Sequence, residues 1–63
     1  MAIEDRVERV KVLLDRIRVY NTLVHQNDFK PDTVGDMKGN AKEMCDEAKS
    51  EVDQIKVEVG QWV

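Results

Sequence analysis

The chain has 63 residues, a net charge of −3 and a single cysteine, and these values exclude several classes of protein. A chain this short forms one domain, residues 1–63, cannot close an intrachain disulfide, and carries too mild a charge to indicate a nucleic-acid mimic. No apolar run approaches the roughly 20 residues that span a membrane, so the sequence predicts a cytoplasmic protein with no membrane partner.

The first predicted element is a helix over residues 2–27. Its apolar residues recur at steps of three, four and seven, the heptad pattern of a helix that buries one stripe: Ile3, Val7, Val10, Leu14, Ile17 and Val24. The step of seven passes over Asn21, which stands at the position that Val7 and Leu14 occupy in earlier heptads. We expect a polar residue there to set the register, by meeting its own copy or a backbone carbonyl near Met37. The alternative is an amide left in water near a fraying helix end.

A turn predicted at residues 28–32 leads to a second helix over residues 33–61. Pro31 cannot continue the first helix, and Asp32 or Thr33 can cap the second, with Asp36 completing a capping box. Its apolar residues again lie three or four apart, with one doubled step of four around Ala48 that indicates a stutter: Val34, Met37, Ala41, Met44, Ala48, Val52, Ile55, Val59 and Trp62. The connection is so short that the helices must be antiparallel neighbours, so the predicted fold is an all-α helical hairpin.

The two apolar patterns also predict which residues face each other. Numbers that sum to 58 bring apolar residues together along the whole hairpin: Val24 with Val34, Ile17 with Ala41, Leu14 with Met44, Val10 with Ala48 and Ile3 with Ile55. The first 30 residues carry six basic against five acidic side chains and the rest carry four against eight, so the halves attract each other weakly.

More apolar surface is present than two helices can cover. Val12, Val19 and Leu23 lie on a side of the first helix away from the predicted stripe, with Tyr20 between the two sides. Val59, Trp62 and Val63 extend past the start of the first helix and have no partner there. These seven residues are the predicted partner interface, and we expect a homo-oligomer, most simply a twofold dimer that forms a four-helix bundle.

The sequence gives little support for an enzyme or a cofactor. Cys45 and His25 could form a nucleophilic pair, but the predicted register separates their levels by about 18 Å. His25, Asp28, Asp32 and Asp36 gather near the turn without the spacing of a known metal loop, so no metal or cofactor site is predicted.

Basic residues on the first helix offer a possible nucleic-acid surface. Lys11 and Arg18 stand one heptad apart, as do Arg9 and Arg16, so an oligomer could align either pair into a stripe. Acidic residues are interleaved with all four, and a nucleic-acid face normally shows a clear basic excess. Ion pairing within and between helices is therefore the favoured role.

The heptads on both helices of so short a hairpin give the chain an architecture that resembles the Rop family of plasmid RNA-binding regulators. That resemblance implies a twofold four-helix bundle and an RNA face on the first helices, which here offer Lys11, Val12, Asp15, Arg18 and Val19. The stretches MAIEDRVERVKVLLDRI and KEMCDEAKSEVDQIKVEV are also similar to small helical-hairpin proteins of tailed phages, which implies a place in the host cytoplasm or the virion. We expect a non-enzymatic protein that acts through protein–protein contacts, with a structural, accessory or inhibitory role. The alternatives are an RNA-binding regulator and an oligomer that sequesters a small ligand.

Overall fold

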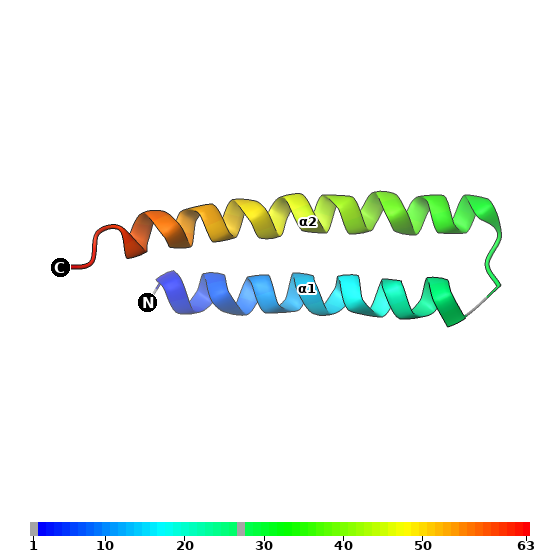
Figure 1. Cartoon of the computed structure of the whole chain (residues 1–63), viewed down its shortest axis with the longest axis horizontal. Coiled ribbons are helices and arrows are strands. Elements are labelled where there is room, and N and C mark those ends of the chain that lie inside the picture. Colours follow the sequence, from blue (N-terminus) through cyan, green and yellow to red (C-terminus); the bar gives the residue numbers. More distant parts are fainter. Residues whose placement is uncertain (1, 27) are drawn as a thin grey trace.

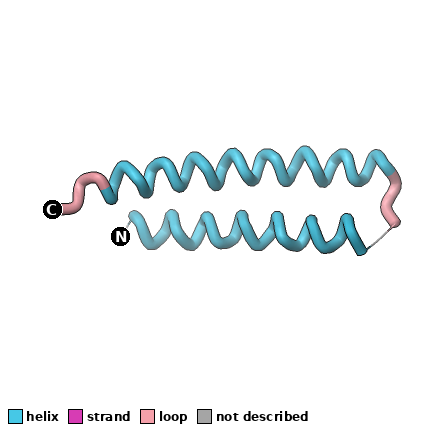
Figure 2. Tube along the Cα trace, in the orientation of Figure 1, coloured by secondary structure: helices cyan, strands magenta, loops and turns pink. Residues whose placement is uncertain are grey.

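The computed structural model describes residues 2–26 and 28–63 and shows an all-α hairpin of two long helices (Figures 1 and 2). Helix α1 is Ala2–Gln26 and helix α2 is Pro31–Val59. The helices lie side by side, with the connecting turn at one end and both termini at the other (Figure 1). The molecule extends 51 × 15 × 13 Å, so it is a narrow rod two helices wide. The predicted hairpin is confirmed.

The second helix begins two residues earlier than predicted. Lys30 is the capping residue, with extended backbone angles (φ −63°, ψ 149°) and no side-chain capping bond, and its carbonyl accepts the Val34 amide at 3.1 Å. Pro31 therefore starts the helix, because its fixed φ suits the first helical position and its missing N–H would have no partner there. The expected caps, Asp32 and Thr33, lie inside the first turn, so that prediction was wrong.

The other helix ends lie close to their predicted places. Helix α1 is described to Gln26, and the predicted last residue, Asn27, lies outside the described residues. Helix α2 ends at Val59 rather than at Gln61. The amides of Gln61 and Trp62 still donate to carbonyls three residues earlier, at 3.0 and 3.1 Å, so the chain turns once more before it ends.

Few side chains are buried where the helices meet. Among the described residues only Leu13 and Ala48 are buried hydrophobic side chains, at 5% and 6% exposure. The rest of the seam is half-buried and recurs at heptad spacing on both helices: Ile3, Arg6, Val7, Val10, Ile17, Tyr20 and Val24 on α1, with Val34, Met37, Ala41, Met44, Glu51, Ile55 and Glu58 on α2. A core this thin supplies little of the burial that stabilises a domain.

The seam on α1 keeps five residues of the predicted stripe and takes in Leu13 in place of Leu14. Leu13 is buried and Leu14 is 54% exposed, so the predicted contact of Leu14 with Met44 was wrong. Asn21 is exposed too, and Tyr20 is half-buried in its place. Two adjacent leucines fit the same heptad equally well, so only the packing against α2 distinguishes them.

The seam on α2 keeps a regular heptad where a stutter was predicted. After Ala48 it continues through Glu51 and Glu58, while Val52 is 48% exposed and Val59 is also exposed. The stutter was inferred so that valines stay in the seam, but an unbroken supercoil carries two glutamates into it. Near the turn, the residues of two predicted pairs, Ile17 with Ala41 and Val24 with Val34, all line one cavity between the helices.

Candidate interaction surface

Near the chain ends, one side of the seam is closed by an ion-pair cluster. Glu51 accepts hydrogen bonds from Arg6 and Arg9, both at 3.1 Å, and its side chain is 15% exposed. Arg6 Nε lies 4.0 Å from Glu58 Oε1, too far for a hydrogen bond, and neither Arg6 Nε nor Glu58 Oε2 has a hydrogen-bond partner. The predicted attraction between the two halves of the chain therefore takes the form of an incompletely bonded cluster. Clusters of this kind contribute little net stability.

The cluster changes the acidity of its central carboxylate. Burial alone would raise the pKa of Glu51, but the hydrogen bonds and positive charges of Arg6 and Arg9 outweigh it and hold this pKa below the ordinary 4.5. Glu51 thus stays ionised at neutral pH, where its single negative charge faces the half-buried guanidinium of Arg6 and the exposed guanidinium of Arg9.

The opposite side of the hairpin is mainly apolar and open. We call it the Leu14 face; it comprises the half-buried seam residue Val7 and the exposed residues beside the seam, which are Leu14 and Asn21 on α1, with Lys38, Cys45, Val52 and Val59 on α2. Asn21 and Lys38 line the same cavity, which places these two helix flanks on one side of the rod. Arg9 and Glu51 meet on the other side. The burial pattern therefore leaves a strip in solvent that is apolar at Leu14, Cys45, Val52 and Val59 and polar at its turn end, at Asn21 and Lys38.

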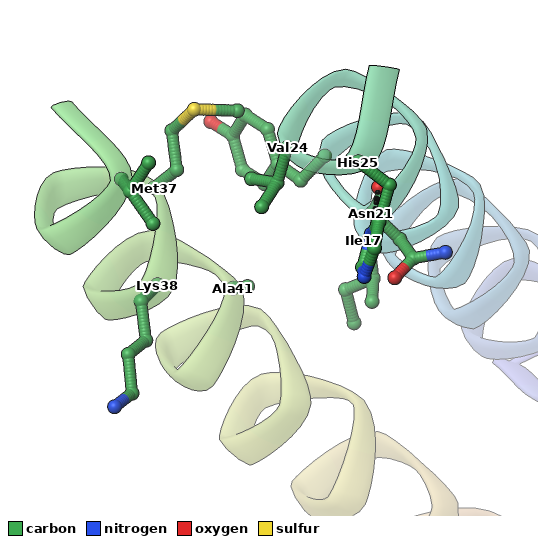
Figure 3. Close-up of a pocket in the computed structure, with 9 residues that line it drawn as sticks. Ile17, Asn21, Val24, His25, Met37, Lys38 and Ala41 are labelled. Atoms are coloured by element: carbon green, nitrogen blue, oxygen red, sulfur yellow. Dashed lines mark hydrogen bonds between the residues drawn. The ribbon is translucent and has the colours of Figure 1, made fainter. Parts of the chain in front are cut away.

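A cavity of about 300 Å³ lies near the turn, at one end of the Leu14 face. Figure 3 shows Ile17, Val24 and Met37 projecting into the space between the helices. The lining surface is almost wholly apolar, and the remaining lining residues are Tyr20, Asn21, His25, Val34, Lys38 and Ala41. Such a cavity has room for one large apolar side chain but offers no converging polar groups that would orient a polar ligand.

The structure divides the seven predicted interface residues among separate places. Val12, Val19 and Leu23 are exposed on α1 away from the Leu14 face, and Tyr20 lines the cavity. Val59 belongs to the Leu14 face, while Trp62 and Val63 form an exposed end, with Trp62 at 70% exposure. Sequence reasoning missed Leu14 and Val52 as surface residues. An unbroken heptad carried through Ala48 would have placed Val52 outside the seam, whereas nothing in the sequence distinguishes Leu14 from Leu13.

Asn21, the predicted register-setting residue, lies outside the buried part of the hairpin. Its side chain is exposed on the single hairpin and lies at the edge of the cavity, while its backbone carbonyl lies 2.7 Å from the Nδ1 atom of His25. Among the described residues, no hydrogen bond joins the Asn21 side chain to α2. A register-setting role therefore stays a prediction that concerns an oligomer.

Three of the four basic residues considered for nucleic acid are paired with acids. Lys11 Nζ lies 3.4 Å from Glu8, Arg18 pairs with Asp15, and Arg9 pairs with Glu51, all as ion pairs within the chain. Arg16 is exposed. These pairs match the predicted ion-pairing role, and they lower the positive potential that a phosphate backbone would meet.

The remaining candidate residues stay apart. Cys45 is an exposed free thiol, whereas the His25 ring lies beside the backbone of its own helix. No group of three or more His, Cys, Asp or Glu side chains among residues 2–26 and 28–63 is placed to hold a metal ion. Neither described helix has the length and apolar content needed to cross a membrane.

Comparison with known proteins gives no further guide to identity. No protein-family model, curated protein or solved structure matches the chain. The helical hairpin shared with the Rop family is thus a likeness of architecture. The function has to be argued from the surfaces of the hairpin itself.

Proposed function

We propose that this protein is a self-associating helical hairpin that works through protein–protein contacts, with no catalytic activity. The observation that carries the proposal is the imbalance between buried and exposed apolar surface. Ten large hydrophobic side chains of the described residues are exposed, whereas the buried hydrophobic residues are one leucine, Leu13, and one alanine, Ala48. Exposed patches of this extent on so small a chain are typical of an interaction surface.

Energetics favour association of copies. A 63-residue chain with one cysteine has no intrachain disulfide to compensate for its thin core, so the remaining common sources of stability are helix packing, a metal and association. Burying one valine or leucine side chain contributes about 1.5 to 3 kcal/mol. Most of these side chains are already about half covered, so each contributes roughly half of that value, and burying several of them on both copies offsets much of the cost of joining two copies.

The first experiment measures mass. We expect light scattering after size-exclusion chromatography to give at least twice the chain mass of 7.3 kDa at micromolar concentration. Helicity measured by circular dichroism should fall together with the mass on dilution, because the hairpin gains stability from its partner. A cooperatively melting, well-folded single chain at that dilution would refute the proposal.

A point variant tests the contribution of the C-terminal end. Replacing Trp62 with Ala should weaken association by about 2 kcal/mol, since aromatic anchors dominate such contacts, and should leave helicity nearly unchanged at high concentration. Lys30→Ala is the matched control, because Lys30 is exposed at the turn and makes no ion pair within the described chain. An unchanged oligomer after Trp62→Ala would count against the predicted interface.

A further inference from the structure

An open cavity and an exposed tryptophan lie near opposite ends of the same rod. The cavity near the turn is apolar and opens on the Leu14 face, and Trp62 is the largest exposed apolar side chain, near the termini. Trp62 is 25 residues beyond Met37, roughly 37 Å along the axis at 1.5 Å per residue. A chain therefore cannot place its own indole in its own cavity.

We propose that a second copy docks on the Leu14 face in the reverse direction, so that Trp62 of each copy fills the cavity of the other. This inference rests on the proposed self-association and specifies its geometry. A half-turn about an axis perpendicular to the rod brings the turn end of one copy over the terminal end of its partner. The contact is made twice by symmetry, as in other twofold dimers.

The position of the axis gives a quantitative check. For Trp62 to reach the level of Met37 in a partner, the axis must pass midway between them, beside Lys49 and Ser50. The two hydrogen-bonded ion pairs across this hairpin, Arg6–Glu51 and Arg9–Glu51, have numbers that add to 57 and 60, while the longer contact Arg6–Glu58, at 4.0 Å, adds to 64. We take residues whose numbers add to about 58 to 60 as level. By this rule Val7 and Leu14 lie level with about residues 51 and 44 of α2.

The apolar part of the Leu14 face is centred on the same level. Three of its apolar residues, Cys45, Val52 and Val59, are on α2. Val7 and Leu14 on α1 lie beside positions 51 and 44 of α2. The average position of the five residues along α2 is therefore about residue 50. The axis demanded by the Trp62 contact thus passes through the middle of the strip. The reversed copy presents apolar residues to apolar residues along its length, with Val7 close to its own copy.

The size of the face fits a second copy. The rod measures 51 by 15 Å, so one face covers roughly 750 Å². Stable protein interfaces bury roughly 800 Å² on each partner. A single chain of the same shape therefore supplies an interface of ordinary size, and a smaller peptide would leave part of the strip exposed.

Lysines border the face and make no ion pair with another described residue: Lys42, Lys49 and Lys56. The proposed dimer brings the two lysine rows near each other. Repulsion between exposed charges is weak and screened by salt, and it is small beside the apolar surface that is covered. The dimer should consequently tighten when salt is added.

The test uses short-range quenching of tryptophan fluorescence by a nitroxide spin label. The labelled chain carries Cys45→Ser, Trp62→Phe and Lys42→Cys, so that its only thiol lies beside the Leu14 face and all emission comes from the unlabelled partner. In the proposed dimer the label lies about one helical turn from the partner's indole. We expect excess labelled chain to lower the Trp62 emission at least twofold, with recovery on dilution.

A control label separates this geometry from the others. Glu43→Cys in the same background puts the nitroxide at nearly the same level of α2 but on the other side of the helix, where it should quench little. Equal quenching from the two label positions would overturn the proposed arrangement. So would the absence of quenching in a sample that light scattering shows to be dimeric. Neither result would contradict self-association itself. A single-chain mass at all concentrations would overturn both.

A second variant avoids dependence on labels. Met37→Ala enlarges the cavity, and Trp62→Phe leaves it partly filled; each should raise the dissociation constant about three- to tenfold, with the double variant less than additive because the two residues touch. Strict additivity of the two effects would contradict the contact between Trp62 and the cavity.

Discussion

The half of the hairpin near the turn is closed by aliphatic and aromatic side chains, whereas the half near the termini is closed in part by ion pairs. Ile17, Val24 and Met37 meet at the turn end, and Arg6 and Glu51 meet at the other. Both halves follow the same three-and-four spacing. The comparison shows that a heptad fixes which positions face the partner helix but does not decide whether apolar residues occupy them.

The two halves join at the buried pair Leu13 and Ala48, which should be the most sensitive point. Leu13→Ala removes the most buried large side chain and should cost about 2 to 3 kcal/mol, a large share of the stability of so small a chain. Urea or thermal denaturation followed by circular dichroism measures the loss. Leu14→Ala is the matched control: Leu14 is exposed on the single hairpin, so its cost should shrink on dilution toward the concentration at which the oligomer dissociates and should stay well below that of Leu13→Ala. Equal losses of unfolding free energy for the two variants at that dilution would contradict the placement of Leu13 in the seam and of Leu14 on the surface.

Replacing the ion pair near the termini with apolar residues tests whether the half near the termini can be closed in the same way as the half near the turn. Glu51→Ala leaves the half-buried guanidinium of Arg6 without its hydrogen bond and should cost about 1 to 2 kcal/mol. Replacing Arg6 and Glu51 together by Leu should be neutral or stabilising by about 1 kcal/mol, since apolar packing replaces a cluster with unsatisfied atoms. Urea denaturation compares the three chains, and a double variant as unstable as Glu51→Ala would contradict this view of the cluster.

The turn half has a separate weakness in the first turns of α2. Gly35 and Gly39 are helical, and a Cβ at either position would meet nothing within 4 Å. Gly39→Ala should therefore stabilise the hairpin by about 0.5 to 1 kcal/mol, seen as a rise of a few degrees in the melting temperature. Gly60→Ala is the control, because its Cβ would press on the Val57 carbonyl oxygen at 3.3 Å. An equal gain at Gly60 would show that helix propensity alone does not explain the effect.

Acid should weaken the terminal half before the turn half. The pKa of Glu51 is lower in the folded chain than its ordinary 4.5, so its contribution is present above about pH 4.5 and is lost as pH falls through the folded value. Glu51→Gln should make the unfolding free energy less dependent on pH in this range. This is the smallest expected effect, and denaturation curves at several pH values below 5 measure it; an unchanged pH dependence in Glu51→Gln would contradict it.

Much of the fold could be predicted from the pattern of residue types. Two amphipathic segments joined across Pro31 allow only antiparallel neighbours, and the structure places both helices side by side with most of the predicted apolar residues between them. The helix start was misplaced because Pro31 can end one helix or begin the next, and both uses agree with its fixed φ.

The candidate site was harder to predict. The choice between Leu13 and Leu14, and between Glu51 and Val52, requires knowing how far each helix is rotated about its axis. Apolar preference favoured Val52, but the geometry of an unbroken supercoil brought Glu51 into the seam. The Leu14 face follows from that rotation and could not be seen in the sequence alone.

The sequence by itself determined two amphipathic helices, their antiparallel pairing and the excess of apolar residues, because these depend on periodicity and chain length. The tertiary structure decided which stripe of each helix is covered. Rotation of a helix by one residue changes the burial of every side chain on its edge, and only the simultaneous fit of both helices fixes that rotation.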